Sequence, residues 1–285
     1  MSIHDKYLDG STKYDIAIKR IKSFCAGKRV LCAFSGGKDS QACYHLCKDA
    51  EIDFSAQYSI TRFEPPELIS FIRQNYPDVV FRRAFTRSLV DEIRVNGLPT
   101  RWHRFCCKAK HKKTPGFDIV VVGVRWEESP RRRDTWRMSG SKEDGVFYIC
   151  PICDWSGMEV WEYLNERGIP HCCLYDQGFS RIGCVCCPLA PNKMRADAKR
   201  WPKTAAMLRL AHLKNWEYKW QLVNGKRNGR KFQEFIDFET ADEAFEYWLD
   251  TGSLIKSKSA RSVEEPCLFA GTGFSESDGN QEDNQ

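Results

Sequence analysis

A glycine-rich hexapeptide that directly follows an apolar run constrains this chain more than any other feature. The run is Val-Leu-Cys-Ala-Phe at residues 30–34, and the hexapeptide is Ser-Gly-Gly-Lys-Asp-Ser at residues 35–40. This pattern predicts a β-strand that enters a tight turn, followed by a helix that begins near Asp39. Gly36 and Gly37 let the main chain approach a ligand where a Cβ would collide. Backbone N–H groups of such a turn and of the helix start attract anions, so we expect a phosphate or sulfate site here.

Two other interpretations of the hexapeptide have to be weighed. The Walker pattern G-x-x-x-x-G-K-[ST] does not fit, because only one adjacent pair of glycines precedes Lys38. An ordinary strand–helix turn, with Asp39 and Ser40 as helix caps, is the simpler alternative. The hexapeptide resembles the PP-loop, S-G-G-x-D-S, of enzymes that cleave ATP to AMP and pyrophosphate or bind adenylyl sulfates. The nucleotide-binding residues that this resemblance implies are Ser35, Gly36, Gly37, Lys38, Asp39 and Ser40.

Apolar runs alternate with helical patterns over the first two thirds of the chain. We expect strands at 29–34, 54–60, 78–81 and 117–124, with helices between them and an N-terminal helix over residues 1–27. This order predicts an α/β fold with a doubly wound, mostly parallel sheet. Ligands of such sheets bind beyond the carboxyl ends of the strands. The loops after Phe34, Ile60 and Val124 should therefore form one pocket.

The remainder of the chain divides by charge. We expect a nucleotide-binding domain at 1–190, a helical appendage at 191–255 and a disordered tail at 256–285, where apolar periodicity is lost. Residues 191–232 contain twelve Lys or Arg and two acids, whereas residues 233–250 contain seven acids and no basic residue. The basic stretch also contains tryptophans, so it could bind nucleic acid by phosphate contacts and base stacking. An amphipathic helix with exposed lysines is the alternative.

Bulk properties exclude some classes of protein. The 285 residues carry a net charge of +6, which is compatible with anionic ligands, and no apolar stretch approaches the ~20 residues of a membrane span. The first residues contain no apolar segment of a secretory signal, so we expect a cytoplasmic protein without a membrane partner. Its fourteen cysteines should then be reduced, which favours metal binding or catalysis over a disulfide framework.

Two groups of cysteines have the spacing of a metal site. Cys106 and Cys107 are adjacent, and Cys184 and Cys187 form a C-x-x-C. Four thiolates from one pair and one C-x-x-C can hold a [4Fe–4S] cluster or a tetrahedral zinc ion. Adjacent cysteines point in diverging directions, which favours the cluster, and buried structural cysteines are the simpler alternative. Cysteines that we interpret as packing residues are Cys25, Cys32, Cys43, Cys47, Cys150, Cys153, Cys172 and Cys173. For the last four, a zinc site is the alternative.

Several segments together resemble the PAPS/APS (sulfonucleotide) reductase family of the PP-loop superfamily. Residues 123–132, Gly-Val-Arg-Trp-Glu-Glu-Ser-Pro-Arg-Arg, are similar to its G-[IV]-R-x-x-E-S-x-x-R segment. Residues 154–161 resemble D-W-[ST]…D-V-W, and residues 169–184 resemble I-P…L-Y-D-x-G-[YF]-x-x-[IL]-G-C. Residues 104–108, Arg-Phe-Cys-Cys-Lys, look like the tandem-cysteine segment of the iron–sulfur branch. The resemblance covers about residues 29–190.

The resemblance implies an adenine nucleotide, either APS, PAPS or ATP, on the loop. It places Gly123, Arg125 and an arginine of 131–133, for which we choose Arg132, at the same anion, because the arginine fork pairs two oxygens at once. Lys38 and Asp39 are also expected to act in catalysis. In a reductase, a thiol reductant such as thioredoxin would be the partner.

One departure separates this chain from the family reductases. Their late E-C-G-[IL]-H motif, whose cysteine attacks the sulfur of the substrate, is absent, and the only late thiol is Cys267. The chain therefore resembles a branch commonly labelled PAPS-reductase-like. We expect sulfonucleotide reduction with Cys267 as nucleophile, and a structural or idle Cys267 is the alternative. The alternative is an ATP pyrophosphatase that uses Mg²⁺ and activates a nucleic acid or a small substrate for sulfur insertion. A non-catalytic nucleotide sensor with a redox-reporting cluster is the third hypothesis.

Overall fold

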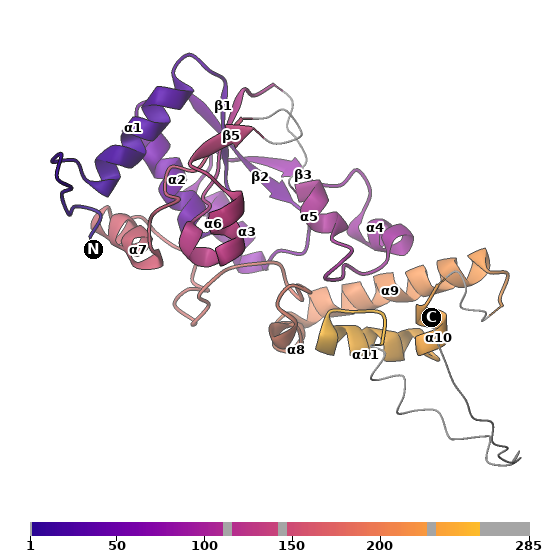
Figure 1. Ribbon diagram of the computed structural model, residues 1–285. Coiled ribbons are helices and arrows are strands. Elements are labelled where there is room, and N and C mark those ends of the chain that lie inside the picture. The colour runs from indigo at the N-terminus through magenta and orange to yellow at the C-terminus, as the bar shows by residue number, and fades with distance from the viewer. Residues whose placement is uncertain (1, 111–115, 142–146, 227–231, 257–285) are drawn as a thin grey trace, which may run out of the picture.

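A six-stranded sheet in the order β3-β2-β1-β4-β6-β5 forms the centre of the computed structural model (Figure 1). The structure describes residues 2–110, 116–141, 147–226 and 232–256. All neighbouring strands are parallel except β5 and β6, which are antiparallel. The strands are β1 (Val30–Ala33), β2 (Phe54–Ile60), β3 (Val80–Arg83), β4 (Ile119–Val121), β5 (Ser139–Ser141) and β6 (Phe147–Ile149).

Helices connect the strands and extend the chain beyond the sheet. The helices of the sheet domain are α1 (Lys13–Cys25), α2 (Lys38–Asp49), α3 (Pro66–Asn75), α4 (Leu89–Asn96), α5 (Phe105–Lys110), the 3₁₀ turn η1 (Trp126–Glu128), α6 (Pro130–Thr135) and α7 (Gly157–Glu166). The later helices are α8 (Pro191–Arg200), α9 (Pro202–Leu222), α10 (Glu234–Asp237) and α11 (Ala241–Thr251). In Figure 1 the later helices lie beside α4, at one end of the sheet domain.

The strand order places a switch point between β1 and β4. From β1 the chain proceeds to β2 and β3 on one side and then crosses to β4 and β6 on the other side. Val30 of β1 aligns with Phe54 of β2 and with Ile119 of β4, so the three strands end at the same edge. The loops after β1 and β4 diverge at this edge, which is where doubly wound sheets bind ligands.

The expected fold class is confirmed, and the differences lie at element boundaries. Helix α1 begins only at Lys13, because Thr12 and Asp15 form a capping box that sets its first turn. Strand β4 is shorter than the apolar run at 117–124, because the Asp118 carboxylate accepts hydrogen bonds from Arg29 and the chain turns after β4. The β5–β6 hairpin was not expected, since β5 is Ser-Gly-Ser and has no apolar alternation.

The later helices pair the two charged stretches with each other. Arg195 of α8 binds Glu246 at 2.9 Å and also Asp250, both on α11. Arg209 of α9 lies 2.9 Å from Asp242. On the buried side, Leu208 and Ala211 of α9 are inaccessible to solvent. These contacts fit the amphipathic alternative and leave fewer cations for a phosphate backbone.

Some expectations fall outside the described residues. Cys267 and almost all of the expected tail belong to residues 257–285, which are not described. Of the described helices, none combines the length and apolar character that crossing a membrane requires.

The start of α7 is held by a buried ion pair. Ser156 and Glu159 form a capping box, and the Glu159 carboxylate also binds the Lys13 Nζ at 2.7 Å. The Glu159 side chain is 2% exposed. Burial by itself would raise the pKa of Glu159, but the hydrogen bonds from Lys13 and Ser156 outweigh it and lower that pKa. The carboxylate therefore stabilises the fold above its ordinary pKa, and this contribution is lost as the pH falls.

We predict that Glu159→Gln lowers the free energy of unfolding by about 3 kcal/mol at pH 7, because it leaves the half-buried Lys13 without a counter-charge. The difference from the wild-type chain should shrink as the pH falls through the range where carboxylates titrate. Urea denaturation at several pH values measures both effects. Glu166→Gln is the matched control, since Glu166 pairs with His4 on the exposed surface. Equal losses in the two variants would contradict the role of the buried pair.

Candidate anion-binding site and cysteine group

The loop at 35–40 is closed by its own serines. Ser40 Oγ accepts a hydrogen bond from the Ser35 N–H at 3.0 Å and donates one to the Gly37 carbonyl at 2.8 Å. Gly36 has a φ of +73°, and a Cβ there would lie 2.7 Å from Ile72 Cδ1. Only glycine fits this position without strain. The loop thus turns tightly, and helix α2 begins within it, at Lys38.

Gly123 lets the exit of β4 touch the start of α2. A Cβ at Gly123 would lie 2.7 Å from the Asp39 carbonyl oxygen and 3.0 Å from the Ser40 backbone nitrogen. These are main-chain atoms, which cannot move aside as a flexible side chain would. The close approach brings the segment after β4, with Arg125, against the first turn of α2.

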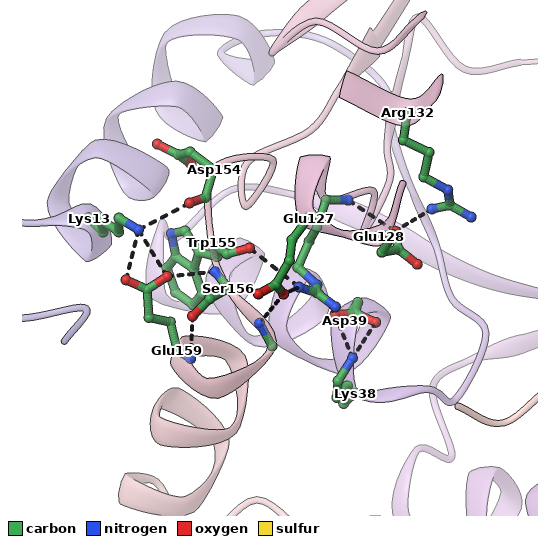
Figure 2. Close-up of polar contacts among 12 residues, drawn as sticks. Lys13, Lys38, Asp39, Glu127, Glu128, Arg132, Asp154, Trp155, Ser156 and Glu159 are labelled. Atoms are coloured by element: carbon green, nitrogen blue, oxygen red, sulfur yellow. Dashed lines mark hydrogen bonds and ion pairs between the residues drawn. The ribbon is translucent and has the colours of Figure 1, made fainter. Parts of the chain in front are cut away.

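Four charged side chains form a network at this contact (Figure 2). The Lys38 Nζ lies 2.9 Å from Asp39 Oδ2, and Arg125 Nε donates to Asp39 Oδ1 at 2.6 Å. Arg125 Nη1 also donates to Glu127 Oε2 at 2.5 Å. Burial alone would lower the pKa of Arg125, but Asp39 and Glu127 raise it, so the guanidinium stays charged. Two cations and two carboxylates leave the network without net charge.

Glu127 connects this network to helix α7. Its carboxylate accepts a hydrogen bond from the Gly157 N–H at 2.6 Å, at the start of that helix. Together, Arg125 and this N–H lower the pKa of Glu127. A cavity of about 480 Å³ opens beside it. The cavity is lined by Lys13, Trp126, Glu127, Arg133, Cys153, Asp154, Trp155, Ser156 and Glu159.

The arginines of α6 point to different partners. Arg132, which we expected at the anion, is paired with Glu128, as Figure 2 shows. Arg133 lines the cavity instead. The sequence could not separate these neighbours, since an i,i+4 pairing of Arg132 with Glu128 is visible only once α6 and η1 are placed.

Tyr175 reaches the loop from a segment far along the chain. The Lys38 N–H, at the first position of α2, donates a hydrogen bond to the Tyr175 hydroxyl at 2.9 Å. The sequence marked Tyr175 only as part of an L-Y-D-x-G-F segment, so this contact was missed. The segment marks Tyr175 in the sequence, but the neighbouring residues do not indicate that its side chain reaches the loop at 35–40.

The structure brings the two expected cysteine groups near each other. Cys106 and Cys107 lie in α5, and Cys184 and Cys187 lie in the loop before α8. The Cys107 thiol interacts with that of Cys106 and is the largest cause that raises the pKa of Cys106, followed by burial and by Cys184. Burial raises the pKa of Cys187, with a further contribution from Cys107. Cys106 thus interacts with Cys184, and Cys187 interacts with Cys107.

Cys186 is turned away from this group. It is buried, its thiol donates to the Met194 carbonyl at 3.5 Å, and its N–H donates to the Asp197 carboxylate at 3.0 Å. On the other side, the Val185 N–H donates to the Phe63 carbonyl at 2.7 Å. These anchors leave Cys184 and Cys187, which are half-buried, as the accessible thiols of the loop.

Four thiols from the two groups are a donor set that a tetrahedral zinc ion or a four-iron cluster could use. Within the ranges that the structure describes, no three His, Cys, Asp or Glu side chains are arranged to hold a metal ion.

Comparison with known proteins identifies the class. The sequence model of the phosphoadenosine phosphosulfate reductase domain matches residues 29–190, which contain the loop, the charged network and both cysteine groups. The fold and the loop are those of a PP-loop nucleotide-binding protein. The chain belongs to the PAPS/APS reductase family.

Several curated proteins and solved structures are similar to this chain. An adenosine 5′-phosphosulfate reductase of Halalkalibacterium halodurans is 26% identical, with 63% of this chain and 83% of that protein aligned. The one of Geobacillus kaustophilus is 25% identical, covering 65% and 85%. An uncharacterized protein of Methanocaldococcus jannaschii is 28% identical over 61% of this chain, which spans only 46% of that protein. A crystal structure of phosphoadenylyl-sulfate reductase from Candida auris aligns with a TM-score of 0.47 at 15% identity, covering 59% of this chain and 87% of that one.

We predict that Gly123→Ala disrupts the site, because its Cβ would push the start of α2 away from the segment after β4. The expected loss is about 1–3 kcal/mol of unfolding free energy, together with weaker binding of adenine nucleotides. Thermal denaturation with and without ATP measures both. Gly140→Ala is the control, since a Cβ there meets no atom within 4 Å. If both variants behave like the wild type, the close approach does not support the site.

Proposed function

We propose that this chain is a sulfonucleotide reductase-type enzyme that binds APS or PAPS at the loop of residues 35–40. The observation that carries the proposal is the loop itself, held against the exit of β4 by Gly123 inside a domain that matches the reductase family. Glycines at 36 and 37 permit the close approach of a phosphate. The first turn of α2 supplies N–H groups that lack acceptors within the helix.

The network of Lys38, Asp39, Arg125 and Glu127 has no net charge, but one of its cations could still bind an anion. Lys38 is bound to its neighbour Asp39 and to no other carboxylate among the described residues, so its Nζ can exchange Asp39 for a phosphate oxygen. Arg125 would continue to hold Asp39 in place. In this arrangement Lys38 contacts the nucleotide, whereas Asp39 and Arg125 position the helix start. Arg133, which lines the neighbouring cavity, would be available for a more distant anionic group.

The reaction that we propose is a transfer of sulfonate to a thiol. The thiolate of Cys267 attacks the sulfur of the sulfonucleotide, an S–S bond forms, and the S–O bond to the phosphate breaks, so that AMP or its 3′-phosphate leaves. An external dithiol, of the thioredoxin kind, then attacks the cysteine sulfur and releases sulfite. The dithiol becomes a disulfide and supplies the two electrons. Cys267 lies outside the described residues, so its role rests on the sequence.

We further propose that Cys106, Cys107, Cys184 and Cys187 hold a [4Fe–4S] cluster. The support is their mutual interaction and the anchoring of Cys186 elsewhere. A bound cluster would supply a redox-active, charge-bearing group that ties α5 to the loop before α8. The protein's own part is to keep Cys106 buried and the other three thiols half-buried, and to hold the loop through Val185 and Cys186.

The reaction is tested by intact-protein mass spectrometry of anaerobically purified protein mixed separately with APS, PAPS and ATP. We expect a mass gain of one sulfonate with APS or PAPS that maps to Cys267 and is lost in Cys267→Ser. Cys173→Ser is the control, because Cys173 is an exposed thiol outside the cysteine group. If no adduct forms and ATP is cleaved to AMP and pyrophosphate, the chain is an ATP pyrophosphatase instead.

The cluster is tested by absorption spectroscopy and iron analysis. We predict that the wild-type protein is brown with broad visible absorption, and that Cys184→Ser loses the colour and most of its iron. Cys173→Ser should retain both. An unchanged spectrum in Cys184→Ser would exclude Cys184 as a ligand, and stoichiometric zinc without iron would replace the cluster by a zinc site.

A further inference from the structure

Tyr175 places a phenol group at the entrance of the anion loop. Its hydroxyl accepts the N–H of Lys38 at 2.9 Å, and a Cβ at Gly37 would lie only 3.4 Å from it. The N–H of Lys38 is one of the first-turn groups that a bound anion would otherwise contact. The hydroxyl therefore lies beside the positions where the oxygens of a bound anion are expected.

The ring of Tyr175 is fixed in this position. It packs edge-to-face on Trp161, with ring centroids 4.9 Å apart, and lies 6.2 Å from the His171 ring. His171 in turn pairs with Asp176 at 2.8 Å. Because aromatic contacts of this kind hold the ring on one side of the loop, the hydroxyl is positioned before any ligand arrives.

The hydroxyl retains a proton that it can donate. Burial raises the pKa of Tyr175 to about 12, so the phenol is neutral at physiological pH. In the described part of the chain its oxygen accepts from Lys38, and no acceptor for its O–H is found. A hydroxyl that accepts one hydrogen bond is polarised toward donating another. Arg181, which is exposed and six residues further on, lies near enough to oppose the rise in this pKa.

We propose that Tyr175 is a binding residue of the anion site, whose hydroxyl passes the hydrogen bond of the Lys38 N–H on to an oxygen of the bound phosphate or sulfate. This inference rests on the nucleotide site proposed above and adds a donor to it from outside the loop. A protonated phenol donates to anionic oxygens, whereas a carboxylate in its place would repel them. Tyr175 thereby favours a fully ionised phosphoryl or sulfuryl group at the first turn of α2.

The inference is tested by isothermal titration calorimetry with inorganic pyrophosphate, sulfate and AMP as separate probes. Tyr175→Phe keeps the ring but removes the hydroxyl, so we expect about a ten-fold higher Kd for the probe that occupies the loop, as for loss of one hydrogen bond to a charged group. The matched control is Tyr163→Phe, which removes a buried hydroxyl that donates to Asp49 at 2.8 Å, from a ring packed on Trp155. It should lower thermal stability but leave the Kd unchanged. Comparison of the pyrophosphate and sulfate arms shows which group sits at the hydroxyl.

The other outcomes separate this inference from the proposed function. Wild-type binding with an unchanged or lower Kd in Tyr175→Phe would overturn the role of Tyr175 and leave the nucleotide site intact. A wild-type chain that binds none of the three probes would overturn both. If Tyr175→Phe does not fold, 3-fluorotyrosine incorporated at position 175 gives a second readout. Its ¹⁹F resonance should shift when pyrophosphate is added, and an unmoved resonance in the presence of bound pyrophosphate would contradict the contact.

Discussion

The contact between Gly123 and the first turn of α2 is the constraint on which the site depends. It brings main-chain atoms of two segments that follow neighbouring parallel strands into direct touch. Since Asp39 lies at this contact, its carboxylate forms ion pairs with Lys38 of its own helix and with Arg125 of the segment after β4. The loop, the exit of β4 and, through Glu127, the start of α7 thus become one unit.

The electrostatic character of this unit follows from the pairing of its charged side chains. A loop with two free cations would attract any anion, whereas here both cations have carboxylate partners. At the anion site that we propose, attraction would then come mainly from oriented N–H groups, which need no counter-ion and are fixed by the fold. Such a site selects by shape, because a ligand must reach the main chain closely enough to use these groups. The glycines at 36 and 37 make that approach available.

The sequence predicted those elements whose formation depends on residues close together in the chain. The strand, the glycine turn and the helix at 30–49 follow from apolar runs and glycine positions, and the α7 start follows from the Ser156–Glu159 capping box. It did not predict contacts between side chains that are far apart in the chain. No local pattern shows that Tyr175 meets Lys38, or that Arg132 is held by Glu128 while Arg133 lines a cavity. The cysteine spacing selected four thiols for one site, and their assignment as ligands stays a prediction.

The loop that carries Cys184 and Cys187 also joins two parts of the molecule. Val185 is bonded to the turn after β2 at Phe63, and Cys186 is bonded to α8 at Met194 and Asp197. The later helices are therefore attached to the sheet domain partly through the segment 184–187, which contains three of the chain's cysteines. A change at Cys184 or Cys187 would therefore act on the attachment of α8 as well as on the chemistry of these thiols.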